Sequence, residues 1–199
     1  MAGIVLIGGG GHALVVAEAA RLARLELVGF LDDDEHPALA RLEPGLRRLG
    51  PIRDAAPSGL WLLALGDLSR RRAWLDTALP PAGPSVVHPR AIVSPTATLG
   101  PGTYVGPGAI VHAHARVGAH AIINSGAIVE HECEVGENTH VAPGAVLGGR
   151  VRVGPDALVG LGSRVLPNLS IGRGCVVAAG AAVVRDVGDG RTVRGVPAR

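Results

Sequence analysis

The sequence predicts a small α/β domain of the βαβ (Rossmann-like) type followed by an all-β solenoid of short parallel strands. Residues 4–34 read as strand, glycine-rich turn, helix and strand, and residues 86–187 repeat every six residues. Only 2% of the residues are aromatic although 47% are hydrophobic. A core built almost entirely from Val, Leu, Ile and Ala suits thin, repeated layers.

The N-terminal segment, residues 1–79, has the pattern of a nucleotide-binding unit. An apolar strand at 4–7 leads into "GGGGH" (8–12), a helix from Ala13 to about Arg24, and a strand that ends in "FLDDD" (30–34). Glycines at a helix N-terminus let the backbone approach a phosphate, and Asp32 or Asp33 stands where an acid would contact a ribose. Tight packing is the alternative reason for the glycines. Some 80 residues hold only half of a dinucleotide fold, which favours a single nucleotide over a nicotinamide cofactor.

A second junction between strand and helix follows at "LLALGDLSRRRAWL" (62–75), with its turn at Gly66 and Asp67. The helix after this turn would carry the three arginines 70–72. The proline-rich "LPPAGPS" (79–85) then predicts a domain boundary, with a linker at 80–85.

Seventeen hexads follow from Val86. Their second position, from Val87 to Val183, is always Val, Leu or Ile, and their sixth position is usually small. Turn residues recur inside each hexad, so the period fits neither an α-helix nor a hairpin meander and predicts a solenoid of very short strands. Each buried Val or Leu contributes about 1.5 to 3 kcal/mol. Residues 188–199 form a C-terminal tail.

The two cysteines, Cys133 and Cys175, both occupy the small sixth position, seven hexads apart. This register places them inside the core on different sides of the coil, so we expect neither a disulfide nor a cysteine zinc site. The net charge is only +2 and there is no basic run, which argues against a nucleic acid partner. The apolar segment 4–7 is too short for a signal sequence or a membrane span, so we expect a cytoplasmic protein without membrane insertion.

The hexads resemble those of the hexapeptide-repeat transferases, which wind a left-handed parallel β-helix with three hexads per coil; the expected handedness comes from this resemblance. The whole chain resembles the NeuD/PglD-type family of bacterial sugar acyltransferases in "GGGGHALVV", "FLDD", "LGDLSRR", "NSGAIVEHECEVGENTHVAPGA", "LPNLSIG" and "VRGVPAR". The resemblance implies a homotrimer that transfers an acetyl group from acetyl-CoA to the amino group of a nucleotide-linked sugar, most closely a UDP-4-amino-4,6-dideoxy sugar. O-acetylation of a sugar or sialic acid is the first alternative, and a non-catalytic trimeric scaffold that binds a nucleotide sugar is the second.

In the hexad "IVEHEC" the inward positions are Val129 and Cys133, so His131 and Glu132 fall on the outward turn. The resemblance implies that His131 is the general base and that Glu132 orients its ring, with Glu130 as a competitor for that role. Imidazole suits the task because the ordinary pKa of histidine lies near neutral pH. The alternative is a corner that is charged only to remain solvated.

Further contacts are implied by the same resemblance. His140 would stabilise oxyanion charge near the acetyl carbonyl, and Asn124 would contact the acceptor. The acetyl-CoA contacts correspond to His140, Gly149, Leu161 and Ala179, with the C-terminal tail nearby. One departure is "VVAAGA", where Ala178 and Ala179 add methyl groups at positions that are often glycine in the family. The nucleotide-sugar contacts correspond to Gly10, Gly11, His12, Asp32, Asp33, Gly66 and Arg71.

A metal site is not expected. The γ-type carbonic anhydrases, which share this β-helix, bind zinc through histidines that include a pair five residues apart. Here the pairs His112/His114, His114/His120 and His131/His140 are 2, 6 and 9 residues apart. We therefore expect His112, His114 and His120 to be surface or interface residues.

Overall fold

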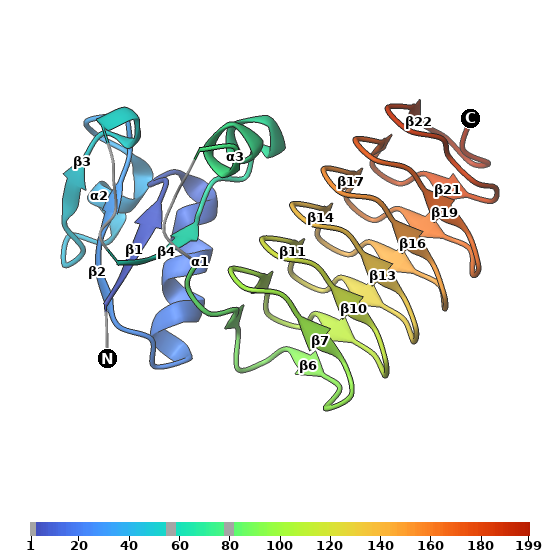
Figure 1. The fold of residues 1–199 in the computed structure, drawn as a ribbon, viewed down its shortest axis with the longest axis horizontal. Helices are drawn as coiled ribbons and strands as arrows, with labels where there is room; N and C mark the ends of the chain where they lie inside the picture. The colour runs from blue at the N-terminus through green and yellow to red at the C-terminus, as the bar shows by residue number, and fades with distance from the viewer. Residues whose placement is uncertain (1–2, 55–58, 78–81) are drawn as a thin grey trace. The chain divides into compact units, whose positions relative to one another are not determined.

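The computed structural model describes residues 3–54, 59–77 and 82–199, and it divides into two compact units, residues 1–89 and 90–199 (Figure 1). The predicted fold class is confirmed: an α/β domain precedes a parallel β-solenoid. The predicted boundary between residues 79 and 80 lies outside the described residues, as does the start of the predicted linker. Within the described ranges, no helix is long and apolar enough to cross a membrane.

The first unit contains one parallel sheet in the order β3-β2-β1-β4. This is the strand order of half a doubly wound sheet, in which ligands bind beyond the carboxyl ends of the strands where the order reverses. Here that point lies between β1 and β4. The elements are β1 (Ile4–Ile7), α1 (Gly11–Leu22), β2 (Leu27–Leu31), α2 (Ala38–Leu42), β3 (Arg48–Gly50), the 3-10 helix η1 (Ile52–Asp54), β4 (Leu60–Leu63) and α3 (Leu68–Leu75).

Helix α1 buries Ala13, Val16, Ala17 and Ala20, which lie on one face at helical spacing. It begins at Gly11, two residues before the predicted start, because the chain turns into helix directly after Gly10, its N-cap residue. The glycine turn and the first turn of α1 are therefore continuous.

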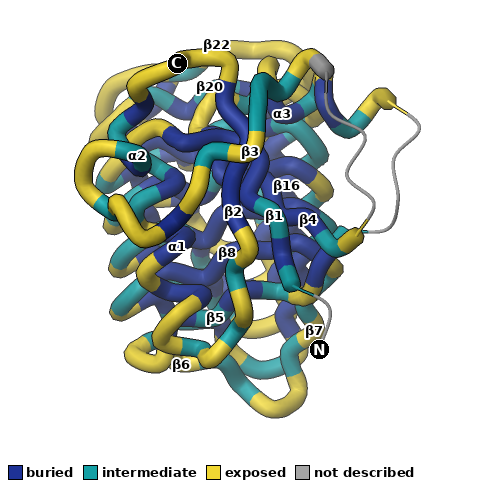
Figure 2. Tube along the Cα trace, turned by 90° about the vertical axis from the view of Figure 1, so that its left-hand side faces the viewer, coloured by how far each residue is buried: buried dark blue, intermediate teal, exposed yellow. Residues whose placement is uncertain are grey.

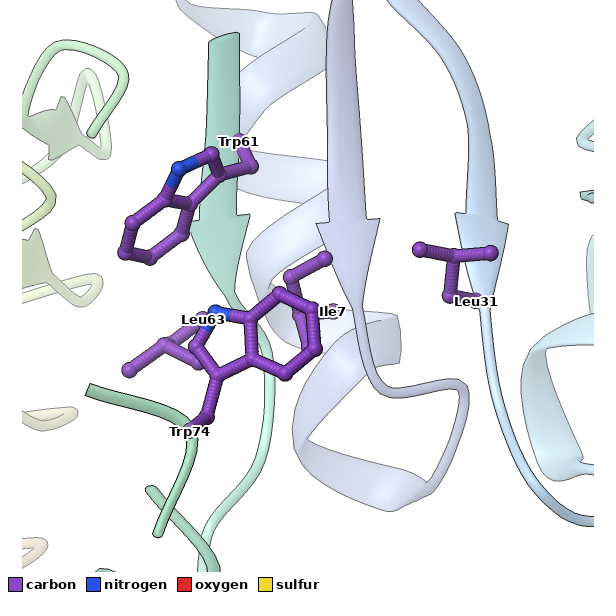
Figure 3. Packing of buried hydrophobic residues seen from close by; sticks show 5 residues of the cluster. All are labelled: Ile7, Leu31, Trp61, Leu63 and Trp74. Carbon is purple, nitrogen blue, oxygen red and sulfur yellow. The ribbon is translucent and has the colours of Figure 1, made fainter. Parts of the chain in front are cut away.

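A cluster of Ile7, Leu31, Trp61, Leu63 and Trp74 forms part of the core (Figure 3). Trp74 reaches from α3 to the side chains of Leu63 and Ile7, and its ring meets that of Trp61 edge to face, with centroids 6.2 Å apart and planes at 80°. This contact fixes α3, and hence the turn before it, against the sheet.

The solenoid is built from two-residue strands that begin every six residues from β6 to β21, and a final strand, β22, follows. Strands three hexads apart pair in parallel, so one coil takes 18 residues, as in the pairing of Ile122 with His140 and of His140 with Leu158. We call the three sides of the coil faces A, B and C. Face A contains β8 (Tyr104–Val105), β11 (Ile122–Ile123), β14 (His140–Val141), β17 (Leu158–Val159), β20 (Val176–Val177) and β22 (Thr192–Val193). Face B contains β6 (Ile92–Val93), β9 (Ile110–Val111), β12 (Ile128–Val129), β15 (Val146–Leu147), β18 (Arg164–Val165) and β21 (Ala182–Val183). Face C contains β7 (Thr98–Leu99), β10 (Arg116–Val117), β13 (Glu134–Val135), β16 (Arg152–Val153) and β19 (Ser170–Ile171). The first strand in hexad register, β5 (Val86–Val87), belongs to the first unit.

The inward positions form the core of the coil, and many of the exposed residues lie in its outer turns (Figure 2). Both cysteines are free, buried thiols, as predicted, and they precede strands of different faces. Cys133 Sγ donates to the carbonyl of Gly148 and Cys175 Sγ to that of Gly188. Burial raises the pKa of the Cys133 thiol to about 11. These are the properties of core residues, not of nucleophiles.

Candidate active site

The turn between β12 and β13 brings together a histidine and a carboxylate. His131 Nδ1 lies 3.0 Å from Glu132 Oε2, and both side chains are about half exposed, at 49% and 52%. The hydrogen bond with His131 lowers the pKa of the Glu132 carboxyl, and the positive charge of Arg150 lowers it further. An ionised carboxylate on Nδ1 fixes the ring and leaves Nε2 as the nitrogen that can accept a proton.

Gly149 lies one coil after His131 and is buried against its ring. A Cβ at this position would stand 2.6 Å from His131 Nε2 and 2.7 Å from Cε1. Only a residue without a side chain leaves room for the imidazole as it is placed. Gly149, which the resemblance assigns to acetyl-CoA binding, thus also leaves the space that the His131 ring occupies.

Glu130 makes different contacts from Glu132. Its Oε2 accepts from the backbone N–H of His131 at 3.3 Å, and its Oε1 lies 3.7 Å from His112 Nε2. Glu132, and not Glu130, is therefore the partner of the His131 ring, which favours Glu132 as the orienting residue.

Sequence reasoning missed Arg150 at this corner. Its Nη1 lies 3.6 Å from Glu132 Oε2, and its Nε donates to Asn168 Oδ1 at 2.7 Å. Arg150 and Asn168 follow Glu132 at intervals of 18 residues. Because one coil takes 18 residues, the side chains of Glu132, Arg150 and Asn168 stack at the same corner. The 18-residue period of the outward positions is the sequence signal that predicts their contact.

Asn124 and His140 also meet, at the corner between faces A and B. Asn124 Oδ1 accepts from the backbone N–H of Ser125 at 2.8 Å, and Asn124 Nδ2 lies 3.0 Å from His140 Nε2. The first bond fixes which end of the amide is the acceptor, so the amide N–H donates to Nε2. The proton of the neutral His140 ring is then on Nδ1.

The remaining acetyl-CoA candidates divide between two corners. Leu161 and Ala179 occupy the first turn position on successive coils of the corner between faces A and B, and Leu161 is 59% exposed. Gly149 lies with His131 at the corner between faces B and C. Face B, with its outward-facing side chains, separates these two corners.

In the first unit, packing explains only half of the glycine turn. Gly8 has a φ of +112°, and a Cβ at Gly9 would stand 2.7 Å from the Phe30 ring. A Cβ at Gly10 or Gly11 would meet nothing within 4 Å. The tight-packing alternative therefore accounts for Gly8 and Gly9, whereas Gly10 and Gly11 border open space at the start of α1, where helix N–H groups lack intrahelical acceptors.

The turn after β4 joins this region. A Cβ at Gly66 would lie 3.6 Å from His12 Cβ, so these two predicted contacts are neighbours in the fold. Asp32 is 8% exposed; its Oδ2 accepts from the N–H of Gly9 at 2.5 Å and its Oδ1 from that of Asp34 at 2.9 Å. Asp32 thus holds the glycine turn in place.

Asp33 is more accessible. Its side chain is 43% exposed, Oδ1 accepts from the N–H of Arg53 at 3.2 Å, and Oδ2 lies 3.9 Å from Arg70 Nη2. Arg71, in contrast, is 1% exposed, and its Nη1 donates to the carbonyls of Leu65 and Leu63 at 2.9 and 3.3 Å. Burial lowers the Arg71 pKa to about 9. This placement favours a structural role for Arg71 at the end of β4.

The other histidines differ from one another. His112 and His114 are exposed, as expected, but His120 is buried at 8% exposure, so its assignment to the surface was wrong. Among the described residues, no group of three or more His, Cys, Asp or Glu side chains could hold a metal ion.

Two families match the chain: the PglD N-terminal domain over residues 3–78 and the bacterial transferase hexapeptide (six repeats) over residues 114–149. A sequence comparison with curated proteins gives no match.

Solved structures match over nearly the full length. A histidine-to-asparagine mutant of perosamine N-acetyltransferase from Caulobacter crescentus, in complex with CoA and GDP-perosamine, is 36% identical, with a TM-score of 0.87 and coverage of 99% of this chain and 95% of that one. The acetyltransferase domain of PglB from Neisseria gonorrhoeae is 33% identical, with a TM-score of 0.90 and coverage of 98% of both chains. WeeI from Acinetobacter baumannii, at 23% identity and a TM-score of 0.80 over 99% of this chain and 98% of that one, shares the fold. The two-part architecture, the glycine turn and these full-length matches show that the chain belongs to the NeuD/PglD-type family of hexapeptide-repeat sugar acetyltransferases.

Proposed function

We propose that this protein transfers the acetyl group of acetyl-CoA to the amino group of a nucleotide-linked amino sugar. The observation that carries the proposal is the His131–Glu132 pair on an outward turn, with Gly149 beneath the ring. Two of the similar structures add support, because perosamine N-acetyltransferase was solved with CoA and GDP-perosamine and the PglB domain with acetyl-CoA.

In the proposed reaction the sugar amine attacks the thioester carbonyl carbon, the C–N bond forms and the C–S bond breaks. His131 Nε2 takes the proton from the attacking nitrogen and passes it to the departing thiolate, which leaves as free CoA. Glu132 holds Nδ1–H and stabilises the imidazolium that forms. Because face B separates the two corners within one chain, the His140 ring N–H that stabilises negative charge on the carbonyl oxygen would come from a second copy, with its position fixed by Asn124. Leu161, Ala179 and Gly149 would contact CoA.

The nucleotide sugar would bind at the carboxyl ends of β1, β2 and β4. Gly10 and Gly11 border open space at the N-terminus of α1, which suits a diphosphate. His12 and Gly66 lie beside them, and Asp33 presents an accessible carboxylate to a base or ribose. Asp32 contributes indirectly, because it holds Gly9.

A homotrimer would complete the site. The outward residues Ile92, Ile110, Ile128 and Val146 form an apolar column on face B, and Ile92 is 64% exposed. Face C instead presents Arg116, Glu134 and Arg152 at its outward positions. A second copy packed on face B would cover the apolar column and face the His131 corner with a second wall for CoA. The expected mass by light scattering is roughly 60 kDa, three 20.1 kDa chains. Dependence on acetyl-CoA and nucleotide sugars supports a cytoplasmic location.

The test is a panel of UDP-, dTDP-, GDP- and CMP-linked amino sugars with acetyl-CoA, read by thiol release and by product mass. The proposal expects a gain of one acetyl group that resists hydroxylamine, because amides resist it and esters do not. A hydroxylamine-labile product would establish O-acetylation instead. Binding of a nucleotide sugar without thiol release, in a trimer, would establish the non-catalytic scaffold.

The His131→Ala variant completes this experiment. Loss of a general base should lower kcat by about 10²- to 10⁴-fold with little change in KM. His112→Ala serves as the control, since His112 contacts Glu130 and not the His131 ring. Near-native turnover by His131→Ala would remove His131 from the role of base.

A further inference from the structure

The second turn position at the corner between faces B and C holds a ladder of polar side chains, one on each coil. Its members, 18 residues apart, are Thr96, His114, Glu132, Arg150 and Asn168. The coils are held in register by backbone hydrogen bonds, such as Arg150 N–H to His131 O at 2.9 Å and Asn168 N–H to Gly149 O at 2.9 Å. Stacked coils rise by about 4.8 Å per layer, so the side chains of neighbouring coils can meet.

Arg150 links two members of this ladder to the proposed base. Its Nη1 lies 3.6 Å from Glu132 Oε2, the same oxygen that lies 3.0 Å from His131 Nδ1. Its Nε donates to Asn168 Oδ1 at 2.7 Å. A continuous chain of contacts therefore runs from the imidazole through the carboxylate and the guanidinium to an amide on the next coil.

The backbone conformation of this turn position is left-handed. Glu132 and Arg150 have φ values of 58° and 60°, in the left-handed region that side chains other than Asn, Asp and Gly rarely adopt. Many equivalent turn positions in the solenoid hold glycine, among them Gly108, Gly126 and Gly144. The left-handed φ recurs at this turn position along the solenoid, since His114 and His120 also have φ values of 59° and 57°. Glu132 and Arg150 occupy it although glycine would fit with less strain.

The ion pair with Glu132 does not by itself give Arg150 a role in stability. An ion pair between half-exposed side chains adds little stability, but a guanidinium anchored by Asn168 limits the positions available to the Glu132 carboxylate. The carboxylate that lies on Nδ1 is thereby kept from turning to solvent. Arg150 therefore restricts the Glu132 carboxylate, and through it the His131 ring, without itself contacting Nε2.

We propose that Arg150 is a positioning residue that, anchored by Asn168, holds Glu132 against His131 Nδ1 so that Nε2 faces the acceptor amine. The inference rests on the proposed function of His131 as general base. The charged and titratable groups around the imidazole are Glu130, Glu132 and Arg150, with His112 and His114 on the preceding coil. Arg150 places a positive charge beside the Glu132 carboxylate and helps to lower its pKa.

The experiment compares Arg150→Met, Arg150→Lys and the control Arg152→Met, which removes the same charge from an exposed outward position on face C. Thermal unfolding and light scattering first establish that each variant keeps its fold and assembly. Arg150→Met should lower kcat by about tenfold with little change in KM, since partial misplacement of a catalytic group costs less than the about 10²-fold of a full 1 Å error. The acid limb of its kcat/KM profile should move to higher pH by about half a unit, the scale of one charge acting near solvent.

Arg150→Lys separates orientation from charge. Lysine restores the positive charge but lacks the guanidinium Nε–H that donates to Asn168 Oδ1. The acid limb should therefore return to its wild-type position, while kcat should recover only in part. Arg152→Met should match wild type in both measurements. Wild-type turnover together with a wild-type acid limb in Arg150→Met would show that Arg150 is only a solvated charge.

An NMR titration of the His131 ring signals, assigned by their loss in His131→Ala, keeps this test separate from the proposed function. The midpoint of that titration should rise in Arg150→Met whether or not an acceptor sugar is known. An unchanged midpoint would overturn the Arg150 proposal. Absence of acetyl transfer by the wild type, with the midpoint shifted as expected, would instead count against the proposed function.

Discussion

Replacing Gly149 by alanine would place a methyl group where the His131 ring now lies. The new Cβ would be 2.6 Å from Nε2, 2.7 Å from Cε1 and 3.2 Å from Cδ2. Non-bonded heavy atoms prefer separations of about 3.5 to 4.0 Å, so the ring must withdraw by about 1 Å. Gly149 is not among the residues with positive φ, so its backbone conformation admits alanine.

The displaced atom is the proposed proton acceptor, and a misplacement of about 1 Å costs roughly 10²-fold in rate. We expect kcat to fall by about that factor. Stability should change by less than about 1 kcal/mol, because the clash is with the free end of a rotatable side chain. Steady-state kinetics and urea unfolding measure the two quantities. Gly45→Ala is the matched control, since a Cβ there meets nothing within 4 Å.

A double-mutant cycle with His131→Ala decides how Gly149 acts. Without the imidazole the methyl group has nothing to displace, so Gly149→Ala should add no further loss in that background. An equal loss in both backgrounds would mean that Gly149 acts through CoA alone. Unchanged kcat in the single variant would show that the ring does not rest on Gly149 in the working enzyme.

Three further predictions concern other parts of the molecule. Gly9→Ala should destabilise the fold by about 1 to 3 kcal/mol through its clash with Phe30. Gly11→Ala should leave urea unfolding unchanged, because its methyl group would enter open space. The same methyl group should weaken nucleotide-sugar binding in calorimetry. Arg71→Met should destabilise by about 2 to 4 kcal/mol because it removes charged hydrogen bonds to two buried carbonyls; lost nucleotide-sugar affinity at native stability would show instead that Arg71 serves the ligand. The native Cys133 thiol should resist Ellman's reagent at pH 8, because its pKa of about 11 leaves it protonated there, and rapid labelling before unfolding would contradict its burial.

The inward half of the solenoid could be predicted from the sequence. An apolar side chain every six residues, from Val87 to Val183, has one stable place, the inside of a coil, because any other arrangement exposes the whole row to water. The same register correctly placed Cys133 and Cys175 in the core. In the first unit, the glycine turn between an apolar strand and an apolar helix was enough to indicate the βαβ unit, although α1 begins at Gly11 and not at Ala13.

The outward half depended on the tertiary structure. The hexad pattern put His131 and Glu132 on an outward turn, but the burial of Gly149 beneath the ring and the contacts of Arg150 join residues one coil apart. Inward positions require only a hydrophobic side chain, and hydrophobicity is a property of each residue that can be read from the sequence. Outward contacts depend on which side chains the coil stacks upon one another and how they turn, and likewise Asp32 reaches Gly9 only because β1 and β2 are neighbours in the sheet.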